Sequence, residues 1–534
     1  MNKRHLAQGR TMELEGTSII GNGRGRRDAG ATFCASNRVS GGELSPEYMT
    51  ASEGEIAEAV RLARQAAPEL ARLPGEGRGA LLRAIADVME KNKAALVERT
   101  PMETGYPEMR IHIEFARTVG QLRLFAEVVE EGSWVQARID HGDPQRKPLP
   151  KPDVRSMLRP LGPVAVFGAS NFPLAISAVG NDTVAALAAG NPVVVKAHPA
   201  HPGTGEIIGL CVAEAIRSCD LPEGAFSLLF DGGHEVGRAL VLHPEIRAVG
   251  FTGSLRGGRA LMDLAAMRSE PISVFAEMGS VNPVFLLPGA LRERGKELAQ
   301  ALHGSLTAGA GQMCTNPGIV VAGEDPALGD FRDAVAELVR GTPAGVMLTE
   351  GIRASYERGT GRLREWEGVW EVASGGEGGA FLFETGADRF VEDSVLHEEV
   401  FGPSTLLVRC GPQEELVRVA ESMEGQLTAS VHGTEEDLME NRRLLETLER
   451  RVGRLIINGF PTGVEVCHAM VHGGPYPATS DGRSTSIGTL SIERFVRPVA
   501  FQDMPDALLP GELKEANPLG IVRLVDGKWG VRDR

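Results

Sequence analysis

Short apolar runs alternate with helical patterns from Pro163 to Pro288, and this alternation limits the possible folds more than any other feature of the chain. An apolar run of about five residues suits a buried strand and is too short for a helix. Such alternation predicts a parallel sheet with helices on both faces and a ligand crevice at the carboxyl ends of its strands. The strands are expected near 163–168, 192–197, 226–230, 247–252 and 272–276.

Further along the chain, residues 282–470 repeat the alternation less regularly, as a second unit of the same kind would. The Pro- and charge-rich stretch Asp143–Arg159 and the segment after Met470 fit neither unit, and could pair as an extension that bridges subunits. We therefore expect an α/β protein with two doubly wound, Rossmann-like domains built on parallel sheets, plus a small β extension for oligomerisation.

The region before the first expected strand shows apolar positions at helical spacing over 52–72, over 77–99 and from about 108 to 131. Ser52 and Glu55 form the pattern of a capping box at the start of the first helix. In the third helix Arg110, Glu114, Arg117 and Gln121 fall on one polar face, by their spacing.

Charge and cysteine content exclude several functions. The net charge is -15 and there is no long basic run, so we expect no nucleic-acid partner. The six cysteines lack CxxC spacing and matching histidine clusters, which predicts neither disulfides nor a metal site. No signal peptide or membrane span is visible, so a cytoplasmic location is expected. Met12 is a plausible natural start, which leaves the role of the first eleven residues open.

A cysteine in a glycine-rich turn, Cys314, is the first residue with chemical potential, although most lone cysteines are small buried hydrophobes. Its thiolate can attack a carbonyl carbon, and the resulting oxyanion needs hydrogen-bond donors. Glu277, at the end of an expected strand, is the candidate general base, because a partly dry crevice raises a carboxylate pKa. Asn171, in the turn after 163–168, is the candidate oxyanion donor, unless it merely holds the turn.

These segments, in this order, resemble the aldehyde dehydrogenase superfamily from about Thr17 to Gln502. The resemblance rests on the 163–173 strand and turn, the glutamate and cysteine motifs, Phe251-Thr252-Gly253-Ser254, and Glu399-Val400-Phe401-Gly402-Pro403. It implies oxidation of an aldehyde to an acid through a covalent Cys314 intermediate, with Asn171 holding the oxyanion, Glu277 activating water and no metal. The residues it implies for cofactor binding are Phe167, Lys196, His198, Gly253, Ser254, Glu399 and Phe401.

Departures from the common family pattern concern the cofactor. NAD-preferring members usually place a Glu three residues after the lysine that corresponds to Lys196, whereas this chain has Pro199. Without a carboxylate to repel it, a 2′-phosphate becomes tolerable, so we expect NADP to be favoured and NAD to be accepted. His198, His201 or His234 could approach that phosphate, although surface histidines are more often merely solvated.

The departures, together with the unusual segment Glu465–Pro477, resemble the branch of α-ketoglutaric semialdehyde (2,5-dioxovalerate) dehydrogenases, which also includes bacterial NADP-dependent fatty aldehyde dehydrogenases. A substrate with a carboxylate needs a cationic partner, and Arg110 and Arg117 are the candidates. Glu114 could instead tie both arginines into ordinary surface ion pairs. Arg123 and Arg155 are weaker alternatives.

Three other functions would each carry a mark in the sequence. A medium- or long-chain aldehyde dehydrogenase would need an apolar channel, against which the arginines argue. A catalytically silent relative would lack Cys314 or Glu277, and both are present. A CoA-acylating relative generally lacks the glutamate.

The resemblance also implies a domain division and a homodimer or homotetramer bridged by the extension. We expect an NAD(P)-binding domain over 12–137 and 158–277, a catalytic domain over 278–469, the bridge over 138–157 and 470–505, and a C-terminal tail over 506–534.

Overall fold

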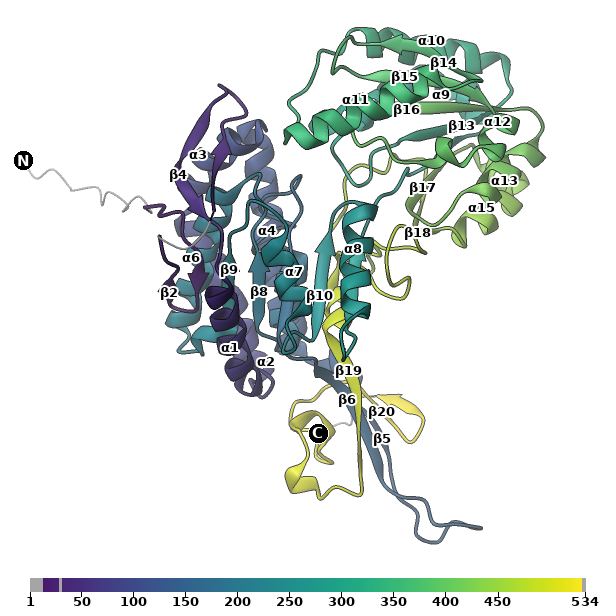
Figure 1. Ribbon diagram of the computed structural model, residues 1–534. Helices are drawn as coiled ribbons and strands as arrows, with labels where there is room; N and C mark the ends of the chain where they lie inside the picture. The colour runs from purple at the N-terminus through teal and green to yellow at the C-terminus, as the bar shows by residue number, and fades with distance from the viewer. Residues whose placement is uncertain (1–12, 28–30, 531–534) are drawn as a thin grey trace, which may run out of the picture.

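The computed structural model describes residues 13–27 and 31–530, which form two globular parts and a projecting arm (Figure 1). The question of a natural start at Met12 and of the first eleven residues lies outside the described residues. Among the described residues, no helix combines the length and apolarity needed to cross a lipid bilayer.

The first part is built on a seven-stranded sheet in the order β11-β10-β7-β8-β9-β1-β2. Its five parallel strands lie where the apolar runs predicted them. The chain starts at β7, moves outward through β8 and β9, and then returns to the other side of β7, which creates a switch point between β7 and β10. The strands are β1 (Ile19–Ile20), β2 (Gly23–Arg24), β7 (Val164–Phe167), β8 (Val193–Lys196), β9 (Phe226–Leu229), β10 (Ala248–Thr252) and β11 (Ser273–Glu277).

Helices cover both faces of this sheet, and Ser52 and Glu55 form the predicted capping box. The prediction of a single helix over 77–99 is wrong: the structure has two helices there, which meet at Asn92. The Asn92 side chain donates to the carbonyl of Val88 at 2.9 Å, and such a local bond competes with the helical hydrogen bonds. The helices are α1 (Glu53–Leu70), α2 (Gly75–Lys91), α3 (Lys93–Thr104), α4 (Glu108–Glu131), α5 (Asn181–Ala189), α6 (Pro202–Ser218), α7 (Glu235–Leu242) and α8 (Leu255–Ala266). A hairpin of β3 (Thr32–Ser36) and β4 (Glu43–Met49) precedes them.

The second part repeats the plan with a sheet in the order β14-β15-β16-β13-β12-β17-β18, parallel except for β14. Its strands are β12 (Val284–Leu286), β13 (Ile319–Gly323), β14 (Val369–Ser374), β15 (Phe381–Gly386), β16 (Ser404–Cys410), β17 (Gln426–His432) and β18 (Val452–Ile457). Its helices are α9 (Pro288–Thr307), α10 (Pro326–Arg340), α11 (Glu350–Glu365), α12 (Ala387–Glu392), α13 (Gln413–Ser422), α14 (Glu435–Glu440) and α15 (Arg442–Glu449). The predicted fold class, two Rossmann-like domains with an extension, is confirmed.

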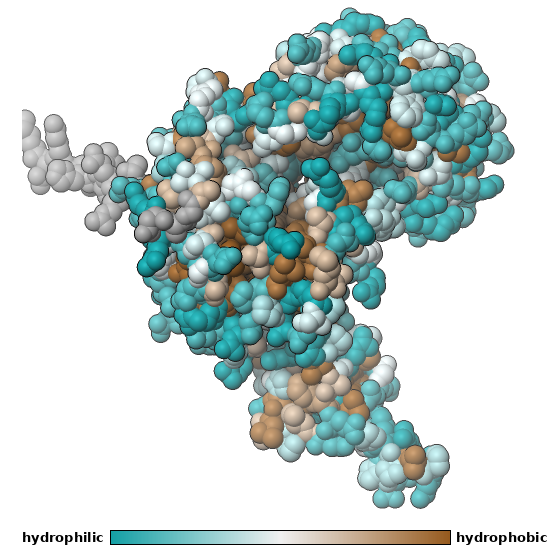
Figure 2. Space-filling model, in the orientation of Figure 1, coloured by the Kyte–Doolittle hydropathy of each residue, from teal (hydrophilic) through white to brown (hydrophobic). Residues whose placement is uncertain are grey.

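The arm is a five-stranded sheet in the order β19-β6-β5-β20-β21. The Asp143–Arg159 stretch and the segment after Met470 do pair, through β6 and β19. The expected C-terminal tail, 506–534, adds β20 to this sheet, parallel to β5. Large apolar side chains are exposed on the arm, including Leu149, Leu508 and Trp529, and hydrophobic residues gather there in Figure 2. The strands are β5 (Arg138–Asp140), β6 (Val154–Pro160), β19 (Val496–Gln502), β20 (Arg523–Val525) and β21 (Lys528–Gly530).

A buried ion pair fastens the root of the arm to the first domain. Arg494, 1% exposed, donates to Asp182 of α5 at 3.0 Å, and Asn181 donates to Ser491 at 2.8 Å. These contacts hold the segment that leads into β19 against α5.

We predict that Asp182→Ala lowers the melting temperature by several degrees, because it leaves a buried guanidinium unpaired at a cost of about 3–5 kcal/mol. Thermal unfolding followed by circular dichroism measures the shift. The matched control is Asp263→Ala, which removes an exposed pair with Arg259 and should have almost no effect. Equal shifts in the two variants would contradict the assignment.

Candidate active site

The carboxylate of Glu277 lies at the carboxyl end of β11 and is 1% exposed. The segment that follows β18 passes across this end of the strand, where the Met278 amide donates to the carbonyl of Ala478 at 2.8 Å and Glu277 bridges to Thr479. The acid is therefore covered by a segment about two hundred residues away in the sequence.

Cys314 follows a tight turn whose backbone is left-handed, a conformation that glycine adopts most easily. Gly309, Ala310 and Gly311 all have left-handed φ, and a Cβ on Gly311 would lie 2.3 Å from the carbonyl carbon of Gly402. The side-chain amide of Asn282 then donates to the carbonyl of Cys314 at 2.9 Å, which fixes the loop that carries the thiol.

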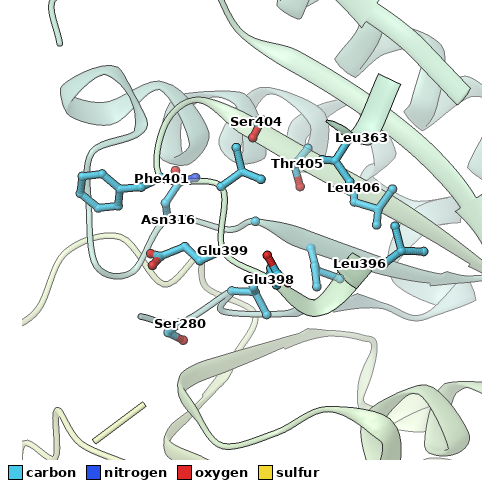
Figure 3. A pocket seen from close by; sticks show the side chains of 14 residues that line it. Ser280, Asn316, Leu363, Leu396, Glu398, Glu399, Phe401, Ser404, Thr405 and Leu406 are labelled. Carbon is cyan, nitrogen blue, oxygen red and sulfur yellow. The ribbon is translucent and has the colours of Figure 1, made fainter. Parts of the chain in front are cut away.

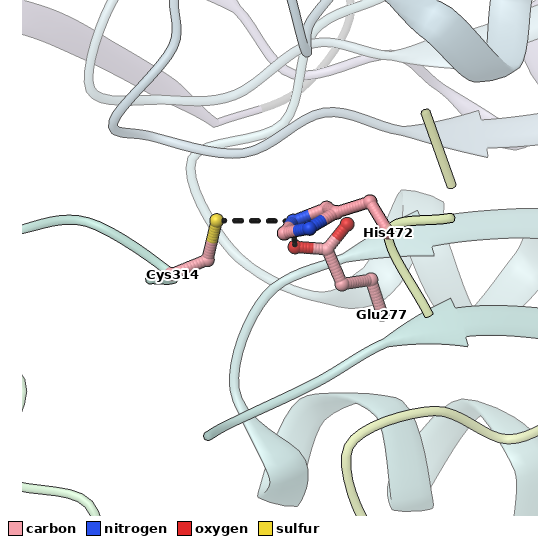
Figure 4. A group of neighbouring side chains, drawn as sticks. All are labelled: Glu277, Cys314 and His472. Carbon is pink, nitrogen blue, oxygen red and sulfur yellow. Dashed lines mark hydrogen bonds and ion pairs between the residues drawn. The ribbon is translucent and has the colours of Figure 1, made fainter. Parts of the chain in front are cut away.

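Cys314, Glu277 and His472 meet at one point (Figure 4). Nε2 of His472 lies 3.4 Å from the sulfur of Cys314 and 3.1 Å from Oε1 of Glu277. The hydroxyl of Ser486 donates to the other carboxylate oxygen. When Nε2 carries a proton, it can donate that proton to the carboxylate of Glu277. When Nε2 is unprotonated, it can accept a proton from the thiol of Cys314. It cannot do both at once.

These contacts set the protonation states. Burial favours the neutral form of Glu277, but His472 and Ser486 outweigh it and lower the pKa of the carboxyl to about 2. The prediction of a raised pKa for this carboxyl is therefore wrong, because it did not take the neighbouring histidine into account. Burial and the charge of Glu277 together raise the pKa of the Cys314 thiol well above its ordinary value.

Sequence reasoning missed His472, although it lies in the segment recognised as unusual. The only signal was a pair of histidines, His468 and His472, in a glycine-rich stretch. The two separate in space: His468 faces Thr489 at 3.2 Å, and only His472 reaches the thiol.

Asn171 is held next to the nucleophile turn by α4. Its side-chain amide donates to the carbonyl of Gln312 at 2.9 Å, two residues before Cys314. Its own carbonyl accepts from Arg110 at 2.9 Å. Glu114, which is buried, accepts the amides of Leu174 and Ala175 at 2.8 and 3.0 Å. One face of α4 thus fixes the turn that carries Asn171.

Arg110 and Arg117 differ in how far their charge is already engaged. The guanidinium of Arg110 stacks on Tyr106 at 3.7 Å in addition to its bond with Asn171. Arg117 packs against Phe172 at 5.5 Å, but among the described residues it makes no hydrogen bond or ion pair, and its Nε is buried without a partner. Burial lowers the pKa of Arg117, while the charges of Glu114, Cys314, Glu277 and Glu465 oppose that shift.

The other readings of these arginines are not borne out by the geometry. Surface ion pairs of Glu114 with Arg110 or Arg117 are not formed among the described residues, because Glu114 is buried against the Asn171 turn. Arg123 is exposed and pairs with Glu90 at 2.8 Å. Arg155 lies on β6 of the arm and pairs with Asp153 at 2.9 Å.

The expected cofactor residues line the carboxyl edge of the first sheet. Phe167 ends β7, Lys196 ends β8, and Gly253 and Ser254 follow β10. Ser254 caps α8 by accepting the Gly257 amide at 3.1 Å. The Lys196 ammonium is partly buried and has one long contact, 3.5 Å to the carbonyl of Asp231.

The three histidines considered for the 2′-phosphate differ in burial and in their contacts. His198 is half-buried and stacks on His201 at 5.4 Å; burial, His201 and Lys196 lower its pKa well below the ordinary value. His201 is fully buried and faces the carbonyl of Ala169 at 3.0 Å, so it is occupied. His234 is exposed at the start of α7.

Glu399 and Phe401 border a pocket in the second domain, beside Ser280 and Asn316. Figure 3 shows the carboxylate of Glu399 directed between Asn316 and Ser280, with the ring of Phe401 extending to the same side. Gly279 faces this carboxylate, and a Cβ there would lie 2.6 Å from its oxygen. The small residue keeps space beside Glu399.

Comparison with known proteins agrees with this geometry. The model of the aldehyde dehydrogenase family matches residues 28–476. The chain belongs to the aldehyde dehydrogenase family. It is 49% identical over 524 residues to alpha-ketoglutaric semialdehyde dehydrogenase 2 of Azospirillum brasilense, covering 97% of this chain and 100% of that protein. It is 45% identical over 489 residues to alpha-ketoglutaric semialdehyde dehydrogenase of Acinetobacter baylyi, covering 90% and 92%.

Solved structures of this aldehyde dehydrogenase fold are similar throughout. A 3,6-anhydro-L-galactose dehydrogenase in complex with NAP superposes with a TM-score of 0.77 at 21% identity, covering 91% of this chain and 99% of the other. A 1-pyrroline-5-carboxylate dehydrogenase from Thermus with bound NAD gives 0.76 at 21% identity, covering 91% and 92%. At such identities the similarity shows the fold.

We predict that Glu277→Gln shifts the pH profile of Cys314 alkylation to lower pH, because the carboxylate charge raises the thiol pKa and its removal lowers it. We expect the wild-type rate to rise only at a pH above the ordinary thiol range, because the Cys314 pKa is raised. Inactivation by iodoacetamide across pH 6 to 10, with peptide mass spectrometry, measures both profiles. Cys467→Ser controls for labelling of that partly exposed thiol. An unchanged or upward-shifted profile would contradict the prediction.

Proposed function

We propose that this aldehyde dehydrogenase oxidises 2,5-dioxopentanoate (α-ketoglutaric semialdehyde) to 2-oxoglutarate, with NADP preferred over NAD. The names of the two curated relatives support the substrate. The observation that carries the proposal is the guanidinium of Arg117, which has no ionic or hydrogen-bond partner among the described residues and lies within electrostatic reach of Cys314.

The arrangement suits a substrate with an aldehyde at one end and a carboxylate at the other. An unpaired guanidinium in a half-buried position gains most from a bidentate carboxylate. Arg110 also has a buried nitrogen without a partner, Nη1, but its Nη2 already bonds the carbonyl of Asn171 and so holds that turn. We therefore assign the substrate carboxylate to Arg117 and a positioning role to Arg110.

The residues can perform the oxidation in sequence. When Nε2 of His472 is unprotonated, and so no longer donates to Glu277, it accepts the proton of Cys314, and the thiolate attacks the aldehyde carbon. The amide of Asn171 and a backbone N–H hold the oxyanion. The nicotinamide, when bound, supplies the hydride acceptor. Glu277 then takes a proton from water as the water attacks the thioester, which releases the acid and restores the thiol.

The cofactor site fits a nicotinamide dinucleotide. Ser254 at the start of α8 suits the pyrophosphate, the ammonium of Lys196 suits the adenosine ribose, and Glu399 suits the nicotinamide ribose. Pro199 follows Lys196 where a repelling carboxylate would favour NAD, and the neutral ring of His198 can gain a proton beside a 2′-phosphate.

A second candidate is oxidation of medium- or long-chain aldehydes. Phe172, Val464, Val466 and Met470 pack into an apolar cluster beside the site, which would suit an alkyl chain. The two functions differ in whether Arg117 contributes to catalysis.

We predict that Arg117→Ala lowers kcat/KM for 2,5-dioxopentanoate by about 10- to 100-fold, mostly through KM, because a charge-assisted bond is lost. The value for hexanal should barely change. Arg123→Ala, an exposed arginine of the same helix, is the matched control. If hexanal is the better substrate of the wild type, or if both variants behave alike, the carboxylate assignment fails and the apolar alternative takes its place.

We also predict that Pro199→Glu reverses the cofactor preference. A carboxylate at this position repels a 2′-phosphate and can accept ribose hydroxyls, so kcat/KM for NADP should fall at least ~10-fold relative to NAD. Pro244→Glu adds the same charge at an exposed position after α7 and should leave the ratio unchanged. A ratio that does not move in Pro199→Glu removes this residue from the explanation.

We further propose a cytoplasmic homodimer or homotetramer joined through the arm. The exposed apolar side chains of the arm support the assembly, and the six unpaired cysteines support a reducing compartment. We propose the same division into domains as the sequence predicts: cofactor binding over 12–137 and 158–277, catalysis over 278–469, the bridge over 138–157 and 470–505, and the tail over 506–534.

A further inference from the structure

We propose that Cys314, His472 and Glu277 also form a binding site for one Zn²⁺, and that zinc bound there stops the enzyme reversibly. The three side chains offer a sulfur, an imidazole nitrogen and a carboxylate oxygen, all within 4.8 Å of one another. No other group of three histidine, cysteine or acidic side chains is so placed in the described part of the chain.

The ligand spacing is close to that of a tetrahedral zinc site. With Zn–S near 2.3 Å and Zn–N or Zn–O near 2.0–2.1 Å, the S···N and N···O separations come to about 3.6 and 3.4 Å. The observed separations are 3.4 Å from sulfur to Nε2 and 3.1 Å from Nε2 to Oε1. The third separation, from sulfur to the carboxylate oxygen, is within 4.8 Å and would be about 3.6 Å in such a site, so the side chains must draw together slightly to hold the ion.

The chemistry of the three groups also matches the ion. A mixed set of thiolate, imidazole and carboxylate is the kind of donor set that zinc accepts, with water in the fourth position. Zn²⁺ takes the place of the thiol proton, which passes to solvent, and no oxidation state changes. His472 presents its Nε2 lone pair with its proton on Nδ1. Ser486 would hold the second oxygen of Glu277 as an outer contact.

The site is preorganised because each ligand is fixed from a different part of the chain. Asn282 holds the Cys314 loop, the Thr485 hydroxyl accepts the main-chain amide of His472 at 2.8 Å, and Glu277 ends β11, which pairs in parallel with β10 at the edge of the first sheet. Binding would occupy the nucleophile, the proton acceptor and the water-activating acid at once. It would also cover a thiol that oxidants could otherwise reach.

Cobalt titration of the full chain tests the site without relying on catalysis. Co²⁺ bound to a thiolate in a four-coordinate site gives a near-ultraviolet charge-transfer band and strong visible bands, and added Zn²⁺ abolishes them. We expect one Co²⁺ per chain in the wild type. Absence of the charge-transfer band, or its persistence in Cys314→Ser, overturns the proposal.

Two more variants identify the other ligands. His472→Asn and Glu277→Gln should each weaken Zn²⁺ binding at least ~10-fold in competition with a chromophoric chelator, since even an outer contact is commonly worth that much. Cys467→Ser keeps the three ligands and should bind as the wild type does. Unchanged affinity in His472→Asn, or loss in Cys467→Ser, places the ion elsewhere. The melting temperature of each variant reports whether it is folded.

Inhibition is measured separately, with whichever aldehyde the wild type oxidises. Micromolar Zn²⁺ should abolish turnover, and a chelator should restore it fully. Failure of restoration, or full activity with one zinc bound at Cys314, overturns the inhibitory role. The spectroscopic result does not depend on the substrate, so it stands or falls apart from the proposed function.

Discussion

A single imidazole nitrogen, Nε2 of His472, organises the active site by contacting both the thiol of Cys314 and the carboxylate of Glu277. The three groups come from a loop of the second domain, the end of a strand of the first, and the segment that follows β18. None can move independently without breaking a contact made by the others. The relative placement of the two domains is therefore tied to the chemistry at their junction.

Much of this architecture could be predicted from the sequence. The five parallel strands of the first sheet were located because each is a short apolar run between helical patterns, and burial on both faces leaves little ambiguity. Cys314 and Glu277 were singled out by their place in a glycine-rich turn and at a strand end, and the structure brings the two side chains together. The capping box at Ser52 was visible for the same local reason.

The features that were missed depend on contacts between distant parts of the chain. His472 lies 158 residues from Cys314 and 195 from Glu277, so no local pattern reveals it. The low pKa of Glu277 follows from that histidine and was missed with it. The break at Asn92 turns on one side-chain bond that competes with helical periodicity. The face of α4 was correctly predicted as polar, yet burial of Glu114 against the Asn171 turn could not be inferred from spacing.

The arm joins residues of the middle of the chain to some of its last described residues. His141 and Asp526, 385 positions apart, lie 2.6 Å from each other, and Leu509, Leu513 and Ile521 pack against Val135 and Met157. Bringing together segments so far apart is entropically costly and slow. During synthesis on the ribosome, the arm can be completed only after both domains have emerged. Assembly through the arm, as proposed above, would therefore require finished chains, which would protect partly made enzyme from premature pairing.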